Sequence, residues 1–251
     1  MRQDLSRRTV VVAGSTSAAG VAAVRTLSQA GARVAAVDIL EDRVQELSAA
    51  YENVTGYVCN LADLQAVEDL AKSVRNDLGP VDGLIHLVGG WRGGEGIKGQ
   101  ADEDWDFLHT SVLTTLRNTS RAFYDDLAAS PAGRLAIVSA QSASAPTADG
   151  AAYAAVKSAA EAWTLAVADG FRQLQGGNEG LIAQHSAALV LVVKALVDDR
   201  MRAAQPERKF PGFTDVSVLA DAVERIFALE AEQINGRRLP LTAGHLVGAV
   251  S

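Results

Sequence analysis

The chain has 251 residues, 48% of them hydrophobic and 21% charged, so its length predicts one large domain with an ample core. The formal net charge is −7, and the clustered Lys and Arg that phosphate binding requires are missing, which argues against a nucleic-acid partner. The single cysteine, Cys59, cannot form an internal disulfide. A signal-peptide apolar segment is missing, as is any run of about 18 apolar residues, so we expect a cytoplasmic protein without a membrane partner.

Short apolar runs rich in β-branched residues recur along the chain, and each has the length of a buried strand. Between the first of them, apolar residues take helical spacing, as at Val21, Val24 and Leu27. Strands that are apolar on consecutive residues and alternate with helices are typical of a parallel sheet with both faces covered. The sequence therefore predicts an α/β fold, a doubly wound Rossmann-like sheet of seven parallel strands in a single domain over residues 1–251. The predicted strands are Thr9–Gly14, Arg33–Asp38, Thr55–Cys59, Gly83–Val88, Arg134–Ser139, Ala188–Val193 and Arg238–Thr242.

Two longer segments, Gly89–Gly99 and Ala195–Thr214, each follow the carboxyl end of a predicted strand. Ligands of open α/β sheets bind at this edge, and long loops there are commonly lids or binding segments. We therefore expect these two segments, together with Ala140–Gly150, to form the pocket for a small-molecule substrate.

The first predicted strand ends in a turn of small residues, Ala13-Gly-Ser-Thr-Ser-Ala-Ala-Gly20, that leads into a helix. Small residues let a pyrophosphate approach the backbone and the positive end of the helix dipole. The pattern departs from G-x-G-x-x-G, and a tight turn without any ligand is the alternative interpretation.

Asp38 closes the second predicted strand, 18 residues after Gly20. A carboxylate at this distance is typical of a hydrogen bond to the ribose 2′-hydroxyl of NAD. It would repel a 2′-phosphate, and neither the turn nor the residues directly after Asp38 include Arg or Lys, so the sequence favours NAD over NADP. The alternative is that Asp38 caps the helix that begins near Glu41.

Tyr153 and Lys157 stand four residues apart on a strongly helical segment, so their side chains share one face. A free tyrosine titrates near pH ~10. An ammonium held nearby favours the phenolate, lowers the pKa of the phenol and makes it a usable proton donor or acceptor near neutral pH. The pair therefore predicts acid–base chemistry, and an exposed pair on a helix surface is the alternative.

These motifs together resemble the classical short-chain dehydrogenase/reductase family over nearly the full length of the chain. The family's T-G-x-x-x-G-x-G turn falls on Ala13–Gly20, its D-V motif on Asn60-Leu61, its N-N-A-G motif on His86–Gly89, and its Y-x-x-x-K motif on Tyr153 and Lys157. The resemblance implies hydride transfer between NAD(H) and a carbonyl compound or secondary alcohol. It also implies that Tyr153 exchanges a proton with the substrate oxygen while Lys157 holds the nicotinamide ribose. The implied cofactor site comprises Gly14, Ser15, Ser17, Ala18, Ala19, Gly20, Asp38, Ile39, Asn60, Leu61, Val88, Gly89, Tyr153 and Lys157.

Three positions depart from the family pattern. The serine that usually stands thirteen residues before the tyrosine is Ala140, and Ser139 and Ser142 are the candidate replacements. The family's helix asparagine aligns with Val112, and the Pro-Gly after the sixth strand is replaced from Lys194 onward. Dihydropteridine reductases of the same family also lack the serine and keep the Tyr and Lys. The departures leave a second interpretation open: a dinucleotide-binding sensor or partner subunit with negligible catalysis.

The segment Gly150–Val167 is apolar nearly all round, and a helix of that kind is covered on two sides. One side is expected to cover the sheet and the other to meet a second copy, and the resemblance implies a homodimer or homotetramer. Cover by the chain's own loops is the alternative.

Other single residues receive plainer interpretations. His86 is expected to be a core residue, and Cys59 is expected to be inert inside a buried strand. Trp91 either stacks on nicotinamide or substrate, or anchors its loop. Because the sequence lacks a His pair at helical spacing and a carboxylate cluster, it predicts no metal site.

Overall fold

The computed structural model describes residues 3–176, 183–242 and 245–246. Its main sheet has the strand order β10-β9-β6-β5-β4-β1-β2-β3. Every neighbouring pair from β3 to β9 is parallel, which confirms the predicted seven-stranded parallel sheet. Its strands are β1 (Thr9–Ala13), β2 (Arg33–Asp38), β3 (Val54–Val58), β4 (Gly83–His86), β5 (Arg134–Ala140), β6 (Ala187–Val193) and β9 (Arg238–Thr242).

Three two-residue strands complete the sheets and were not expected from the sequence. β10 (His245–Leu246) pairs antiparallel with β9, while β7 (Leu196–Val197) and β8 (Thr214–Asp215) pair only with each other. β3 ends one residue earlier than expected, so Cys59 follows the strand instead of lying inside it. Cys59 is nevertheless buried, and burial raises the pKa of its thiol to about 11.

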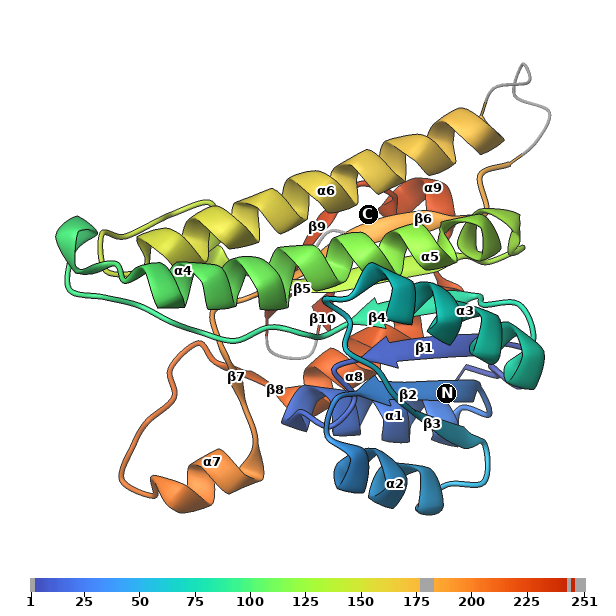
Figure 1. Ribbon diagram of the computed structural model, residues 1–251, viewed down its shortest axis with the longest axis horizontal. Helices are drawn as coiled ribbons and strands as arrows, with labels where there is room; N and C mark the ends of the chain where they lie inside the picture. Colours follow the sequence, from blue (N-terminus) through green and yellow to red (C-terminus); the bar gives the residue numbers. More distant parts are fainter. Residues whose placement is uncertain (1–2, 177–182, 243–244, 247–251) are drawn as a thin grey trace.

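The helices cover both faces of the sheet (Figure 1), as the doubly wound fold requires. α1, α2 and α8 pack with one apolar layer, and α3, α5 and α6 pack with the other. Successive β1 residues alternate between the layers, with Val10 and Val12 in the first and Val11 and Ala13 in the second. The helices are α1 (Ala18–Gln29), α2 (Glu41–Ala49), α3 (Leu64–Leu78), α4 (Asp102–Leu108), α5 (Thr115–Ala129), α6 (Ala151–Gln175), α7 (Asp199–Ala204), α8 (Val216–Arg225) and α9 (Ala231–Ile234). Shorter helical turns are Ile97–Gly99, the π-helical His109–Thr114, Gln141–Ala143 and Ile226–Ala228.

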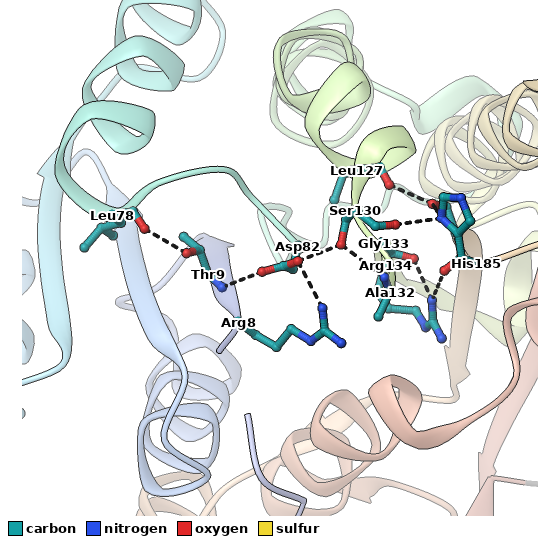
Figure 2. Close-up of polar contacts among 11 residues, drawn as sticks. Arg8, Thr9, Leu78, Asp82, Leu127, Ser130, Ala132, Gly133, Arg134 and His185 are labelled. Atoms are coloured by element: carbon teal, nitrogen blue, oxygen red, sulfur yellow. Dashed lines mark hydrogen bonds and ion pairs between the residues drawn. The ribbon is translucent and has the colours of Figure 1, made fainter. Parts of the chain in front are cut away.

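A polar network joins the amino ends of the central strands, at the edge away from the candidate site (Figure 2). The Asp82 carboxylate accepts hydrogen bonds from the Thr9 backbone N–H at 2.9 Å and from the Ser130 hydroxyl at 2.6 Å. Arg8 lies 3.3 Å from the same carboxylate. The carboxylate therefore links the start of β1 to the loop before β5.

Arg134, the first residue of β5, is buried beside this network and donates hydrogen bonds only to backbone carbonyls. Burial lowers the pKa of its guanidinium to about 10. The accepting carbonyls belong to Gly133, His185, Ile226 and Leu229. One side chain thus satisfies carbonyls from several segments that would otherwise be buried without donors.

Arg134→Met is expected to lower the free energy of unfolding by about 3 kcal/mol, because each buried carbonyl left without a donor is costly. Urea unfolding followed by circular dichroism measures the change. Arg25→Met is the matched control: Arg25 is exposed on α1, and its replacement is expected to change stability by less than about 0.5 kcal/mol. Equal stability of the two variants would contradict a structural role for the Arg134 hydrogen bonds.

Candidate functional site

Two adjoining clefts lie at the carboxyl ends of the parallel strands. The first has a volume of about 740 Å³ and the second about 830 Å³, and both are lined by Leu87, Val88 and Gly89, which follow β4. Together they form a crevice from the end of β2 to the amino end of α6. Of the predicted site residues, the first cleft is lined by Gly14, Ser17, Asp38, Ile39, Asn60, Leu61, Val88 and Gly89. The second is lined by Ala19, Val88, Gly89, Ser139, Ser142, Tyr153 and Lys157.

The turn after β1 is built by two glycines that sit against other backbone atoms. Gly14 has a φ of +83°, and a Cβ there would lie 2.9 Å from the backbone of Leu87 and Val88. A Cβ on Gly20 would lie 2.2 Å from the Gly14 carbonyl oxygen. Ser17 caps α1 by accepting a hydrogen bond from the Gly20 N–H at 3.0 Å. The glycines therefore allow the first turn of α1 to approach the loop after β4.

Three predicted cofactor residues, Ser15, Ala18 and Gly20, line neither cleft. Gly20 serves the packing of the turn instead. Ser15 is fully buried, and its hydroxyl has no hydrogen-bond partner among the described residues. Ala18 is exposed at the start of α1. The turn is thus where the motif predicted it, but only part of it faces the clefts.

Asp38 lies on the first cleft and is fixed by three hydrogen bonds. It accepts from the Thr16 N–H at 3.0 Å, from the Thr16 hydroxyl at 2.8 Å and from the Ile39 N–H at 2.8 Å. α2 begins after Leu40 without any side-chain cap, so the alternative that Asp38 caps this helix is wrong.

The first cleft also contains a cation that sequence reasoning missed. Arg43 lies five positions beyond Asp38, and α2 places it on the cleft wall. Because a helix brings residues several positions apart onto one side, inspecting only the direct neighbours of Asp38 overlooked it. Ile39 and Leu40, which are 63% and 49% exposed, add apolar surface to the same wall.

Tyr153 and Lys157 lie on the first two turns of α6 and both face the second cleft. Lys157 is buried, its Nζ donates a hydrogen bond to the Val138 carbonyl at 2.8 Å, and Nζ lies 5.8 Å from the centre of the Tyr153 ring. The alternative of an exposed surface pair is therefore wrong.

The expected lowering of the Tyr153 pKa is not found in this structure. Burial raises the pKa of Tyr153, since the phenolate is harder to solvate than the phenol. Burial likewise lowers the pKa of Lys157 to about 8, with nearby Glu161 opposing the change. Desolvation therefore outweighs the attraction between phenolate and ammonium that the sequence argument considered.

Both candidate serines lie on the second cleft. Ser139 is buried near the end of β5, and its hydroxyl has no partner in the described part of the chain. Leu135 and Ile137 point to the apolar layer of α5 and α6, so strand alternation places Ser139 on the side of α6. Ser142 follows in the helical turn Gln141–Ala143 and is half-buried. Ala140 between them is buried and does not line the cleft.

His86 is buried, and its two ring nitrogens lie 3.1 Å and 3.2 Å from the hydroxyls of Thr115 and Thr119. Burial lowers its pKa to about 3, so the ring is neutral at physiological pH. These features confirm His86 as a core residue. Val112 is also buried, in the π-helical segment. Trp91 is 67% exposed and lines the second cleft.

Within the described ranges, no three His, Cys, Asp or Glu side chains are grouped so that they could hold a metal ion. The helices of the same ranges include none that is long and apolar enough to cross a membrane.

The sheet order, the glycine turn and the crevice at the carboxyl edge define a Rossmann-like α/β protein. A family model described as short chain dehydrogenase matches residues 8–175. The chain therefore belongs to the short-chain dehydrogenase family.

Similar proteins include several dehydrogenases and reductases. A 2,3-dihydro-2,3-dihydroxybenzoate dehydrogenase of Bacillus subtilis is 29% identical over 61% of this chain and 60% of its own length. A 1-deoxy-11-beta-hydroxypentalenate dehydrogenase of Streptomyces avermitilis is 39% identical, but the match covers only 34% of this chain and 33% of that protein. The chain thus matches less than two thirds of the length of these relatives. A 3-oxoacyl-acyl-carrier-protein reductase of Vibrio harveyi is 24% identical over 96% of this chain and 98% of its own.

Among solved structures, a short chain oxidoreductase of Pseudomonas aeruginosa PAO1, described as containing an atypical catalytic center, superposes with a TM-score of 0.82 at 19% identity. The superposition covers 97% of this chain and 98% of that one. Its NADPH-bound form gives a TM-score of 0.81. At this identity the likeness concerns the fold alone.

Proposed function

We propose that the protein is an oxidoreductase that transfers hydride between NAD(H) and a carbonyl compound or secondary alcohol. The observation that carries the proposal is the convergence of Tyr153, Lys157 and the unpartnered hydroxyl of Ser139 on a cleft that adjoins the glycine turn. The residues fit a dinucleotide: the turn at Gly14 has no side chain, Asp38 offers a carboxylate, and Ile39 offers apolar surface. The Tyr153 cleft adjoins this wall, where a nicotinamide supplies hydride when bound.

In the reductive direction, we assign Tyr153 as the proton donor. As hydride adds to the carbonyl carbon, the π electrons move to the carbonyl oxygen, which takes the phenolic proton. Ser139 donates a hydrogen bond to the same oxygen and stabilises its developing charge. Lys157 supplies a positive charge that favours the phenolate left on Tyr153. Oxidation of an alcohol runs these steps in reverse.

The second candidate is a dinucleotide-binding sensor or partner subunit with negligible catalysis. It is favoured by two buried apolar side chains, Ala140 and Val112, at positions where the resemblance implies a serine and an asparagine. Fluorescence titration with NADH, followed by a turnover screen of ketones, quinones and pterins, separates the two candidates. Saturable NADH binding with turnover of any class supports the enzyme, and saturable binding without turnover supports the sensor.

NAD(H) is proposed to be preferred over NADP(H), on the strength of the Asp38 carboxylate on the first cleft. Arg43 on the same wall would act in the opposite direction by attracting a 2′-phosphate. Wild type is expected to bind NADH at least about tenfold more tightly than NADPH, which corresponds to about 1.4 kcal/mol. Asp38→Asn, which keeps an acceptor for Thr16, is expected to remove most of this preference.

Arg43→Gln is the complementary variant and is expected to weaken NADPH binding while leaving NADH binding unchanged. Tighter binding of NADPH than of NADH by wild type would contradict the preference and assign the dominant role to Arg43. Both dissociation constants come from the same fluorescence titration.

A homodimer or homotetramer formed through α5 and α6 is also proposed. Within the described residues, the outer side of α6 leaves apolar residues exposed, including Ala162, Leu165 and Ala166. A groove of about 430 Å³ between α5 and α6 is lined in part by Tyr124 and Trp163. Light scattering is expected to give the mass of two or four copies, and a monomer at every concentration would contradict the proposal.

A further inference from the structure

The cleft that contains Tyr153 is cationic, although the whole chain has a net charge of −7. Its lining includes Lys157, Lys194 and Arg208 but only one carboxylate, Asp149. Asp149 accepts a hydrogen bond from the Gly96 N–H at 2.8 Å, which ties it to the loop after β4. Lys157 is buried and donates to a backbone carbonyl. Lys194 and Arg208 are therefore the exposed cations available to a ligand.

Lys194 directly follows β6 and is held by the turn Pro211–Gly212. Its Nζ donates a hydrogen bond to the Pro211 carbonyl at 3.1 Å, which uses one of its three N–H donors. Gly212 has a φ of +76°, and a Cβ there would lie 3.3 Å from Cδ of Lys194. The turn thus supports the stem of the lysine and fixes its ammonium at the cleft.

Arg208 is brought to the same place by two aromatic rings. Its guanidinium carbon lies 5.1 Å from the centre of the Phe210 ring and 5.8 Å from that of Phe213. The Lys194 Nζ lies 6.0 Å from the centre of the same Phe213 ring. Both separations are within the range of cation–π attraction.

Neither cation forms an ion pair with a carboxylate in the described part of the chain. Arg208 instead donates to the Gln205 side chain at 2.8 Å. Two cations gathered at one ring repel each other, and an anion bound between them would relieve that repulsion.

We propose that Lys194 and Arg208 form a subsite for a carboxylate carried by the substrate, so that the protein selects anionic carbonyl compounds. The proposal rests on the proposed oxidoreductase function, whose reacting group, Tyr153, lies in the same cleft. A cofactor phosphate is the less suitable ligand for a 2′-position contact, because Asp38 and the ribose-binding wall belong to the first cleft, which neither cation lines. An ammonium and a guanidinium together recognise a carboxylate through charge-assisted hydrogen bonds.

Three matched ketone pairs test the proposal: 4-acetylbenzoate, levulinate and anthraquinone-2-carboxylate, each compared with its methyl ester. Dissociation constants are measured by calorimetry on the NADH-loaded protein, and turnover is measured separately. The proteins are wild type, Lys194→Met/Arg208→Gln, and the control Arg200→Gln/Lys209→Met. The control removes the same charge from exposed residues that do not line the cleft.

Wild type is expected to bind at least one acid about tenfold more tightly than its ester. The Lys194→Met/Arg208→Gln variant is expected to lose that preference while its NADH affinity stays unchanged, and the control is expected to behave as wild type. Equal affinity for every acid and ester, no binding of any pair, or an unchanged preference in the variant would overturn the proposal. So would a parallel loss of NADH affinity, which would assign the two cations to the cofactor.

Binding and turnover distinguish failure of this subsite from failure of the enzymatic function. Selective acid binding without turnover of any ketone would support the subsite and contradict hydride transfer. Turnover without preference for acids would do the reverse.

Discussion

Tyr153→Phe is expected to lower kcat for ketone reduction by about 10³-fold and to change the NADH dissociation constant by less than about twofold. The substitution removes only the hydroxyl that donates the proton, and the ring that packs against the α5 and α6 layer remains. Loss of kcat without loss of cofactor binding would therefore report on proton transfer itself. Stopped-flow or steady-state oxidation of NADH measures the first quantity, and fluorescence titration measures the second.

Tyr124→Phe is the matched control, because Tyr124 lies on α5, stacks on Phe171 and does not line the Tyr153 cleft. Its turnover is expected to match that of wild type. If Tyr153→Phe also turns over at the wild-type rate, Tyr153 has no part in the mechanism.

The pH dependence of the same reaction tests the partnership with Lys157. Because burial lowers the pKa of Lys157 to about 8, its ammonium is charged below that pH and becomes neutral above it. The positive charge near Tyr153 is then lost, so kcat/KM for reduction is expected to fall as pH rises above 8. Lys157→Arg, which stays charged, is expected to lose this alkaline decline. A decline that persists unchanged in the arginine variant would assign it to another group.

The parallel sheet could be predicted because its strands leave a strong local signal. Every residue of β6 is buried, for instance, and the run from Ala187 to Val193 contains only Ala, Val and Leu. β7, β8 and β10 have two residues each, which is too short for any periodicity to appear. Their pairing depends on where the long loops travel, and that is decided by contacts distant in sequence.

The site divides in the same way between local motifs and burial. The spacing of Tyr153 and Lys157 places both on one helix face whatever the surroundings. The direction of their pKa changes depends on desolvation, which comes from packing and not from spacing. Arg43 and Arg208 likewise reach the clefts only through the paths of α2 and of the segment after α7. Sequence order therefore identified the reacting pair but not the charges around it.

Ser139→Ala is expected to lower kcat by about 10²–10³-fold and at the same time to raise the free energy of unfolding by about 1 kcal/mol. The two effects have opposite signs because the hydroxyl is buried without a partner in the described residues, so it destabilises the free protein. It becomes useful only when a carbonyl oxygen accepts its hydrogen bond. Turnover and urea unfolding on the same preparation measure both effects.

Ser142→Ala is the matched control, since Ser142 lines the same cleft but is only half-buried and follows β5. Its kcat is expected to stay within about threefold of wild type, because strand alternation places Ser139 rather than Ser142 on the α6 side. A large loss in Ser142→Ala with full activity in Ser139→Ala would transfer the donor role to Ser142. Full activity in both variants, and in the double variant, would mean that carbonyl polarisation depends on Tyr153 alone, as the buried alanine at position 140 also permits.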